Sequence, residues 1–145
     1  MPQLTFPISA RELLADVRVN VSAADMAQLY AHRRAAPPPV VTRGELDTGS
    51  NVTGVSAAVI QRLALVPHGK GSTRGIGGNV TVQLYRVSLS VFDPANPLVP
   101  WFVVPDLEVM ELPSSVRYDV LIGMDVLLEC RLLLDGPART FTLDY

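Results

Sequence analysis

The sequence predicts an all-β, barrel-like domain, and three observations carry the prediction. Short apolar runs with alternating polar residues recur along the 145 residues, a pattern typical of half-buried strands. Helical spacing of apolar residues is confined to short segments. Gly, Pro and Asn separate the runs, as they do in closed or packed β architectures.

The composition limits the domain count and the class of partner. A length of 145 residues with 48% apolar content suits one globular domain over residues 1–145. A formal charge of −2 without a basic stripe argues against a nucleic-acid partner. Because Cys130 is the only cysteine and neither a leader pattern nor a membrane-length apolar run occurs, we expect a cytoplasmic protein without a membrane partner.

The N-terminal part of the chain predicts two strands and a helix. Residues 4–6 are strand-like, and residues 17–21 alternate between apolar and polar. Ser22 can cap a helix that ends before Pro37. We interpret residues 22–36 as a helical insert on the surface rather than a functional lid, because it carries no convergent polar groups.

The central part predicts a strand, an acidic turn and a long hairpin. Residues 40–42 are expected to form a strand leading to the turn at Asp47, and residues 55–65 fit either another strand or a short helical turn. Glycines in 69–78 precede the long alternating run 80–91. This combination predicts a β-hairpin arm with a pliable tip, the alternative being an ordinary exposed hairpin.

The C-terminal part predicts further short strands. Residues 101–104 are expected to form a strand, followed by a looser acidic segment that extends to Pro113. The apolar run 118–123 ends in a glycine. The closing strands are expected over residues 132–134 and 140–143.

A short helix is expected between these strands. It covers residues 124–130 and is capped near Met124 or Asp125. Cys130 lies at its end among leucines, which predicts a buried structural thiol.

The triplet Asp47-Thr48-Gly49 is the candidate for chemistry. Two carboxylates that share a proton can supply both the base and the acid when water attacks a peptide bond. The N–H of Gly49 can point at the carboxylate, and the Thr48 hydroxyl can hydrogen-bond across a two-fold axis. Because no second Asp-Thr-Gly or Asp-Ser-Gly occurs, the second carboxylate would come from another copy of the chain. The bare triplet also occurs at ordinary turns.

Metal and cofactor sites are not expected. His32 and His68 are isolated in the sequence, without a second ligand at a useful spacing. A water-based mechanism with two carboxylates also requires no cofactor.

Four segments, in the right order, resemble the retropepsins, the dimeric aspartic proteases of retroviruses and their bacterial relatives. Residues 47–49 are similar to the catalytic triplet, 75–78 to the flap tip and 121–123 to the apolar-apolar-Gly element that braces the active-site loop. The chain ends, 2–6 and 141–145, resemble terminal strands that interleave between subunits. The resemblance implies a closed retropepsin-like barrel with a flap hairpin, and the closing stretch looks most like small bacterial members.

The resemblance also implies a function and a set of site residues. It implies an aspartic endopeptidase in which each subunit of a homodimer contributes Asp47, Thr48 joins the two active-site loops and Gly49 contacts the backbone of an extended peptide. At the flap, Ile76 would offer its backbone N–H to a water or to the substrate carbonyl. The other residues implied to line the cleft are Arg74, Gly75 and Gly77 at the flap and Ser50, Asn51, Val52 and Leu121 below it.

Two residues depart from the family pattern. Glu45 occupies a position, two before the triplet, that is usually apolar in retropepsins. We hypothesise that it favours polar or basic side chains in the adjacent subsite or raises the apparent pKa of the dyad. Alternatively it turns outward and pairs with Arg43 or Arg74. Met124 stands where many retroviral enzymes have an arginine, which predicts a dimer that is weaker or held together elsewhere.

These departures leave a second function open. The chain could be a catalytically weak module that keeps the retropepsin fold for peptide binding or dimerisation. The intact Asp47-Thr48-Gly49 favours the enzyme over this alternative.

Overall fold

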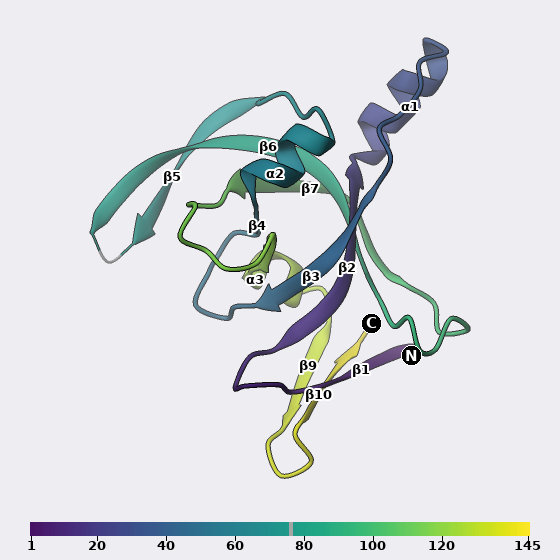
Figure 1. Ribbon diagram of the computed structural model, residues 1–145, viewed down its shortest axis with the longest axis vertical. Coiled ribbons are helices and arrows are strands. Elements are labelled where there is room, and N and C mark those ends of the chain that lie inside the picture. Colours follow the sequence, from purple (N-terminus) through teal and green to yellow (C-terminus); the bar gives the residue numbers. More distant parts are fainter. Residues whose placement is uncertain (76) are drawn as a thin grey trace.

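A computed structural model describes residues 1–75 and 77–145 of the chain. These residues form ten strands and three helices (Figure 1). The helices are α1 (Ala23–Ala31), α2 (Ala57–Arg62) and α3 (Met124–Leu127). The strands are β1 (Gln3–Pro7), β2 (Leu14–Val21), β3 (Val40–Leu46), β4 (Gly54–Val55), β5 (Gly69–Gly75), β6 (Gly78–Phe92), β7 (Phe102–Glu111), β8 (Val120–Ile122), β9 (Arg131–Asp135) and β10 (Thr140–Asp144).

Six of the strands close into a barrel. They follow the order β2-β3-β8-β4-β7-β6, and β2 also pairs with β6, so the sheet returns to its first strand. The β3–β8 and β4–β7 pairs are parallel, whereas the other pairs are antiparallel. Closure leaves these strands with few free edges, and it confirms the expected all-β barrel. β5 lies outside the ring and pairs with β6 as a long hairpin.

The barrel core follows from the alternation along the strands. On β2 every second side chain, from Ala15 to Val21, points into the barrel and is buried. Val87, Leu89 and Val91 of the paired strand β6 are buried in the same way. The strand predicted over residues 17–21 is therefore confirmed, and it begins three residues earlier, at Leu14.

The two chain ends form a separate sheet of three strands in the order β1-β10-β9. β1 pairs with β10 of the same chain, from Gln3 opposite Asp144 to Pro7 opposite Thr140. The rings of Phe6 and Phe141 stack there, with centroids 5.3 Å apart. The ends, which resemble strands exchanged between subunits, are thus paired with each other within one chain.

Helix α1 is a surface element, as predicted for the insert. Ser22 caps it, its Oγ accepting a hydrogen bond from the Asp25 N–H at 3.1 Å. None of its residues is buried, and Tyr30 is 86% exposed. The helix projects from the barrel (Figure 1) and meets β7 near its first turn, where the Ala24 N–H donates to Asp106 at 3.1 Å.

Among the described residues, no helix has the length and apolar character needed to cross a membrane.

The other two helices refine the sequence predictions. Residues 55–65, left open between strand and helix, contain the end of β4 and then α2, which Ser56 caps by accepting from the Val59 N–H at 3.3 Å. The short helix expected over 124–130 is α3, which ends earlier, at Leu127; the residue at its cap position is Gly123, next to the expected Met124 or Asp125, and it has no side chain to form a cap. The Asp125 carboxylate lies inside the first turn, where it accepts from the Val126 N–H at 2.9 Å and also from Thr53.

Two further expectations are corrected. The acidic segment after residue 104 is not loose, since β7 continues to Glu111. Its pairing with β6 shifts register between Val87 and Leu89, so Pro105 falls at an irregularity where a missing N–H is tolerated. Cys130 is half-buried rather than buried, and its burial raises the pKa of the thiol.

Candidate active site

Asp47 follows the last residue of β3, where that strand runs parallel to β8. Its N–H donates to the carbonyl of Ile122 on β8 at 2.9 Å, which continues the β3–β8 ladder by one step. Its carbonyl accepts from the Ser50 N–H at 3.2 Å, so the chain turns at once. The side chain is neither buried nor fully exposed. A carboxylate is therefore fixed at a strand end, where solvent can reach it.

Gly49 holds the carboxylate. Its N–H donates to Asp47 Oδ1 at 2.8 Å, as the sequence predicted. A Cβ on Gly49 would stand 3.1 Å from the same oxygen, a tight contact that glycine avoids. Thr48 between them is exposed, and its hydroxyl has no hydrogen-bond partner within the described residues.

Backbone hydrogen bonds from the start of α3 fix the loop after Asp47. The Met124 N–H donates to the Ser50 carbonyl at 2.8 Å, and the Asp125 N–H donates to the Asn51 carbonyl at 3.3 Å. Gly123 packs directly on the Val52 backbone. The segment predicted from the resemblance to brace the active-site loop therefore does contact it.

Hydrogen bonds between the buried Thr53 and the half-buried Asp125 fix the far end of the loop. The Asp125 carboxylate accepts from the Thr53 hydroxyl at 2.6 Å and from the Thr53 N–H at 2.9 Å. The same hydroxyl accepts from the Gly123 N–H at 3.0 Å. Thr53 is completely buried, so these bonds replace water that cannot reach it. The sequence reasoning missed both residues.

Replacing Thr53 with Val is expected to destabilise the protein by about 1–3 kcal/mol, because the change leaves the buried Gly123 N–H unpaired and removes one of the two hydrogen bonds to Asp125 Oδ1. Urea denaturation measures the free energy of unfolding. Thr53→Ser keeps the hydroxyl and is the matched control, expected to lose clearly less. Little loss in Thr53→Val and a larger loss in Thr53→Ser would show that the methyl group, not the hydroxyl, is what matters.

Asp119, just before β8, connects β3 with the start of α2 through hydrogen bonds. Its carboxylate accepts from the Ser56 hydroxyl at 2.7 Å and from the Thr42 hydroxyl at 3.3 Å. Its carbonyl accepts the Ser56 N–H at 2.8 Å. β3, α2 and the segment before β8 are thereby joined next to the Asp47 loop. The sequence could have indicated Ser56, because a serine before an apolar run often begins a helix. It could not indicate its partner Asp119, which lies 63 residues away.

Glu45 lies on the same strand face as Asp47. The intervening Leu46, like Gly44, is buried in the barrel, whereas Glu45 is only partly buried. Burial raises the pKa of Glu45 above its usual value of 4.5, and the charges of Glu12 and Asp47 raise it further, while Arg117 lowers it.

The alternative that Glu45 pairs with Arg43 or Arg74 is wrong. Arg43 faces Asp16 at 3.7 Å, and the ion pairs of the described residues include neither Arg74 nor Glu45. The nearby cation Arg117 is engaged by Glu12 at 3.3 Å. The hydroxyl of Tyr118 donates to the same Glu12 carboxylate.

Glu45→Gln is expected to stabilise the protein at pH 7 by less than about 1 kcal/mol, the size expected for a partly exposed charge. Because the folded state raises the Glu45 pKa, the folded chain holds this proton more tightly than the unfolded chain. The contribution of Glu45 to stability is therefore complete below its unfolded pKa and is lost as the pH rises through the folded value. Glu12, Asp47, Arg117 and Tyr118 are the charged or titratable groups around it.

Urea titrations at pH 7 and pH 4, made at one protein concentration, measure this effect. The two proteins should differ at pH 7 and converge at pH 4. A gain of the same size at both pH values would assign the effect to packing instead of charge.

The remaining predicted site residues fall into two groups. Ser50, Asn51 and Val52 form the loop after the triplet, with the Ser50 hydroxyl donating to the Val52 carbonyl at 2.8 Å. Leu121 lies on β8 directly beside Glu45. These residues are brought together with Asp47.

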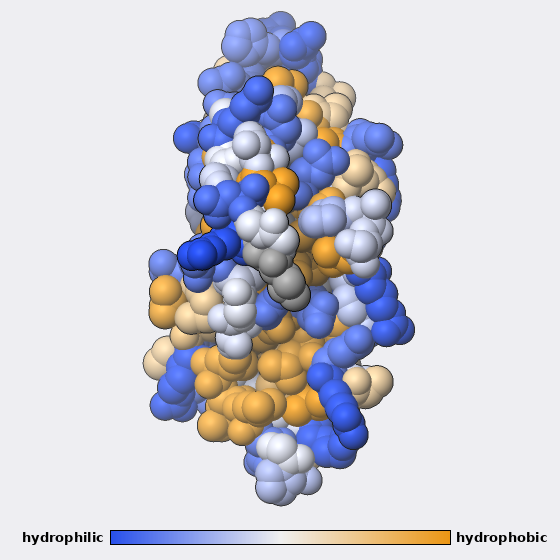
Figure 2. All heavy atoms as spheres, turned by 90° about the vertical axis from the view of Figure 1, so that its left-hand side faces the viewer, coloured by the Kyte–Doolittle hydropathy of each residue, from blue (hydrophilic) through white to orange (hydrophobic). Residues whose placement is uncertain are grey.

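The hairpin residues are placed differently. Arg74 and Gly77 are exposed near the turn between β5 and β6, and no hydrogen bond of the described residues joins the hairpin tip to the Asp47 loop. Gly75 pairs with Gly78, whose φ of +107° suits glycine. Ile76 lies outside the described residues. The hairpin reaches out on the same side of the barrel as the loop after β3 (Figure 1), and apolar surface lies below it (Figure 2).

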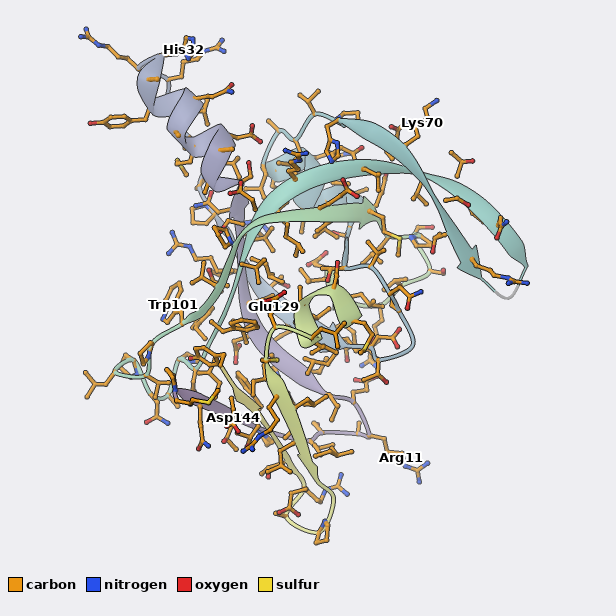
Figure 3. The ribbon with its side chains drawn as sticks, turned by 180° about the vertical axis from the view of Figure 1, so that it is seen from behind. Arg11, His32, Lys70, Trp101, Glu129 and Asp144 are labelled. Atoms are coloured by element: carbon orange, nitrogen blue, oxygen red, sulfur yellow. The ribbon has the colours of Figure 1, made fainter. Side chains whose placement is uncertain are left out.

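The two histidines lie apart, as their isolation in the sequence suggests. His32 lies at the outer end of α1 (Figure 3), and His68 pairs with Glu108 at 3.3 Å. Within residues 1–75 and 77–145, no group of three His, Cys, Asp or Glu side chains is placed to hold a metal ion.

A sequence profile described as aspartyl protease matches residues 39–126. This span covers more than half of the chain and includes the triplet, the bracing strand and most of α3. The chain therefore belongs to the aspartyl protease family.

The fold is retropepsin-like. A retropepsin-like aspartic protease from Rickettsia conorii superposes with a TM-score of 0.62 at 12% identity, covering 99% of this chain and 90% of that one. The EIAV protease in complex with the inhibitor HBY-793 gives 0.47 at 18% identity, with coverages of 86% and 95%. The retroviral protease-like domain of Ddi1 from Leishmania major gives 0.46 at 13% identity, with coverages of 90% and 88%. No curated protein is similar enough in sequence to match.

Proposed function

We propose that the protein is a homodimeric aspartic endopeptidase whose catalytic pair consists of one Asp47 from each copy. The observation that carries this proposal is the Asp47 carboxylate itself, held at 2.8 Å by the Gly49 N–H at a strand end and open to solvent. One chain supplies a single Asp-Thr-Gly, whereas the chemistry needs two carboxylates. A second copy related by two-fold symmetry supplies the other.

The reaction follows from two carboxylates that share one proton. The ionised Asp47 takes a proton from a water molecule as the water oxygen bonds to the peptide carbonyl carbon, while the protonated Asp47 donates its proton to the carbonyl oxygen. The resulting tetrahedral diol collapses as the Asp47 that took the water proton gives it to the nitrogen and the C–N bond breaks, while the other Asp47 takes a hydroxyl proton from the diol, so the pair again holds one proton. The exposed Thr48 hydroxyl is free to hydrogen-bond to the partner loop.

An extended peptide is the substrate that this surface suits best. β5 pairs on one side with β6 and is otherwise unpaired among the described residues, so the hairpin offers a strand edge above the Asp47 loop. Addition of a peptide strand supplies main-chain hydrogen bonds, and alternate side chains enter pockets on the floor. We assign the β5–β6 hairpin the role of a flap.

The terminal sheet supports association of two copies. Leu133 and Leu134 of β9 are 56% and 58% exposed, and Leu128 just before that strand is 75% exposed. Exposed leucines on or next to the edge strand of a sheet favour burial against another surface. Association through this sheet would not depend on a side chain at position 124.

Cleavage of a diverse peptide mixture, read by mass spectrometry between acidic and neutral pH, tests the proposal. The wild-type chain should cut and the Asp47→Asn chain should not. Activity per chain should also rise with protein concentration as dimers form, reaching a plateau when all chains are paired. Dimeric protein that cuts nothing would instead support a peptide-binding module.

A further inference from the structure

The floor of the proposed cleft carries an acidic side chain whose position is set by strand register. Glu45 and Asp47 are two residues apart on one face at the end of β3, about 7 Å along an extended strand. Leu14 of β2 lies opposite Glu45 on one side, and Leu121 of β8 on the other. Both leucines are half-buried. Glu45 therefore lies in a partly apolar surface and is the neighbour of the reacting Asp47 carboxylate on the same strand face.

The charge of Glu45 has no cation of its own. Arg117 and the Tyr118 hydroxyl both bind Glu12, so the Glu12 carboxylate is satisfied by its neighbours. Arg43 faces Asp16. Within the described residues no salt bridge is made by Glu45, although Glu12 and Asp47 lie near enough to perturb it.

This environment suits a cation brought by the substrate. Partial burial, followed by repulsion from Glu12 and Asp47, raises the pKa of Glu45, and a bound ammonium or guanidinium would stabilise the charged carboxylate against both effects. The aliphatic stem of Lys or Arg can pack on Leu14 and Leu121 while its charged end reaches the carboxylate. A Glu or Asp side chain in the same place would add a further negative charge.

We propose that Glu45 selects an Arg or Lys side chain next to the scissile bond. This inference rests on the proposed function, since it takes Asp47 as the cleavage point. A two-fold axis through the dyad gives each dimer two Glu45 side chains, one on either side of the bond. The substrate class is therefore a peptide with a basic residue flanking the cleaved bond, best with one on each side.

Matched peptides test this inference. They are identical except at the residue before the cleaved bond, which is Arg, Lys, Met or Glu, and kcat/KM is measured for the wild type, for Glu45→Gln and for Glu108→Gln. Glu108→Gln removes an equal charge from β7, where the partner is His68. The readout is the Arg-to-Met ratio within each protein, which cancels differences in overall activity.

The wild type and Glu108→Gln should prefer Arg over Met by about 10-fold or more, the size expected for a charge-assisted hydrogen bond. In Glu45→Gln the ratio should fall to about one to three by the same reasoning, since the amide keeps the shape but loses the charge. The Glu peptide should be the poorest wild-type substrate and should improve in the variant.

The outcomes separate the two proposals. Cleavage with the same Arg-to-Met ratio in the wild type and in Glu45→Gln would overturn the role of Glu45 and leave the protease standing. Failure to cut any peptide would overturn the protease. Calorimetric binding of the four peptides then decides the role of Glu45 alone: tighter binding of the Arg peptide that disappears in Glu45→Gln supports it, and equal binding of all four overturns it.

Discussion

Asp47→Asn is expected to lower kcat/KM for peptide cleavage by about 10³-fold or more, because the amide can neither accept a proton from water nor donate one to the carbonyl oxygen. The fold should survive. The Asn side-chain oxygen can still accept the Gly49 N–H that Asp47 Oδ1 accepts at 2.8 Å, and the backbone bond to Ile122 is unaffected. Circular dichroism and thermal melting would show the intact fold, and steady-state kinetics would show the loss.

Mixing the two proteins tests whether the carboxylates act as a pair. In a one-to-one mixture at exchange equilibrium, random pairing gives about one quarter of dimers with two Asp47 residues, so activity per wild-type chain should fall to about half. A larger excess of Asp47→Asn should lower it further in proportion to the wild-type fraction. Unchanged activity per wild-type chain would mean that each chain cleaves alone.

Local patterns were sufficient where a structural feature depends on neighbours in sequence. The alternation in β2, the Ser22 cap of α1 and the Gly49 N–H at the Asp47 carboxylate all involve residues within a few positions of each other. In each case one residue type has one strongly preferred role at that spacing. The resemblance to retropepsins added what such patterns lack, namely that residues 121–123 would brace the loop.

Contacts between distant residues explain what was missed. Thr53 and Asp125 are 72 residues apart, and each alone is an ordinary polar residue in a turn or helix start. The cap position of α3 falls on Gly123, which has no side chain. β7 passes through Pro105 because its partner β6 shifts register there, and no property of residues 105–111 alone indicates that.

For Glu45 the sequence left two orientations of the side chain open. The sequence offered a carboxylate that entered the cleft or one that paired outward with Arg43 or Arg74. The outward alternative depended on where the arginines lie, and Asp16 on β2 engages Arg43. Entry of Glu45 into a cleft stays a prediction. Only the arrangement of three separate segments settles such a competition between ion pairs.

Gly123→Ala is expected to destabilise the protein by about 3–5 kcal/mol, from overpacking and from hydrogen bonds lost as the loop moves. A Cβ at this position would lie 2.7 Å and 2.8 Å from the carbonyl carbon and oxygen of Val52 and 2.9 Å from the Ser50 carbonyl oxygen. All three are backbone atoms, so no side-chain rotation can relieve the contacts. With φ of −90°, the backbone itself would accept alanine, and the cost is therefore steric.

Gly136→Ala is the matched control, because a Cβ there meets no atom within 4 Å. Its free energy of unfolding should stay within about 0.5 kcal/mol of the wild type. Peptide cleavage by Gly123→Ala should fall even under conditions where the variant is folded, since the Ser50–Val52 segment that must shift follows the Asp47 turn directly. If Gly123→Ala is as stable and active as Gly136→Ala, the start of α3 does not position the catalytic loop, and the Asp47 carboxylate is held by Gly49 and β8 alone.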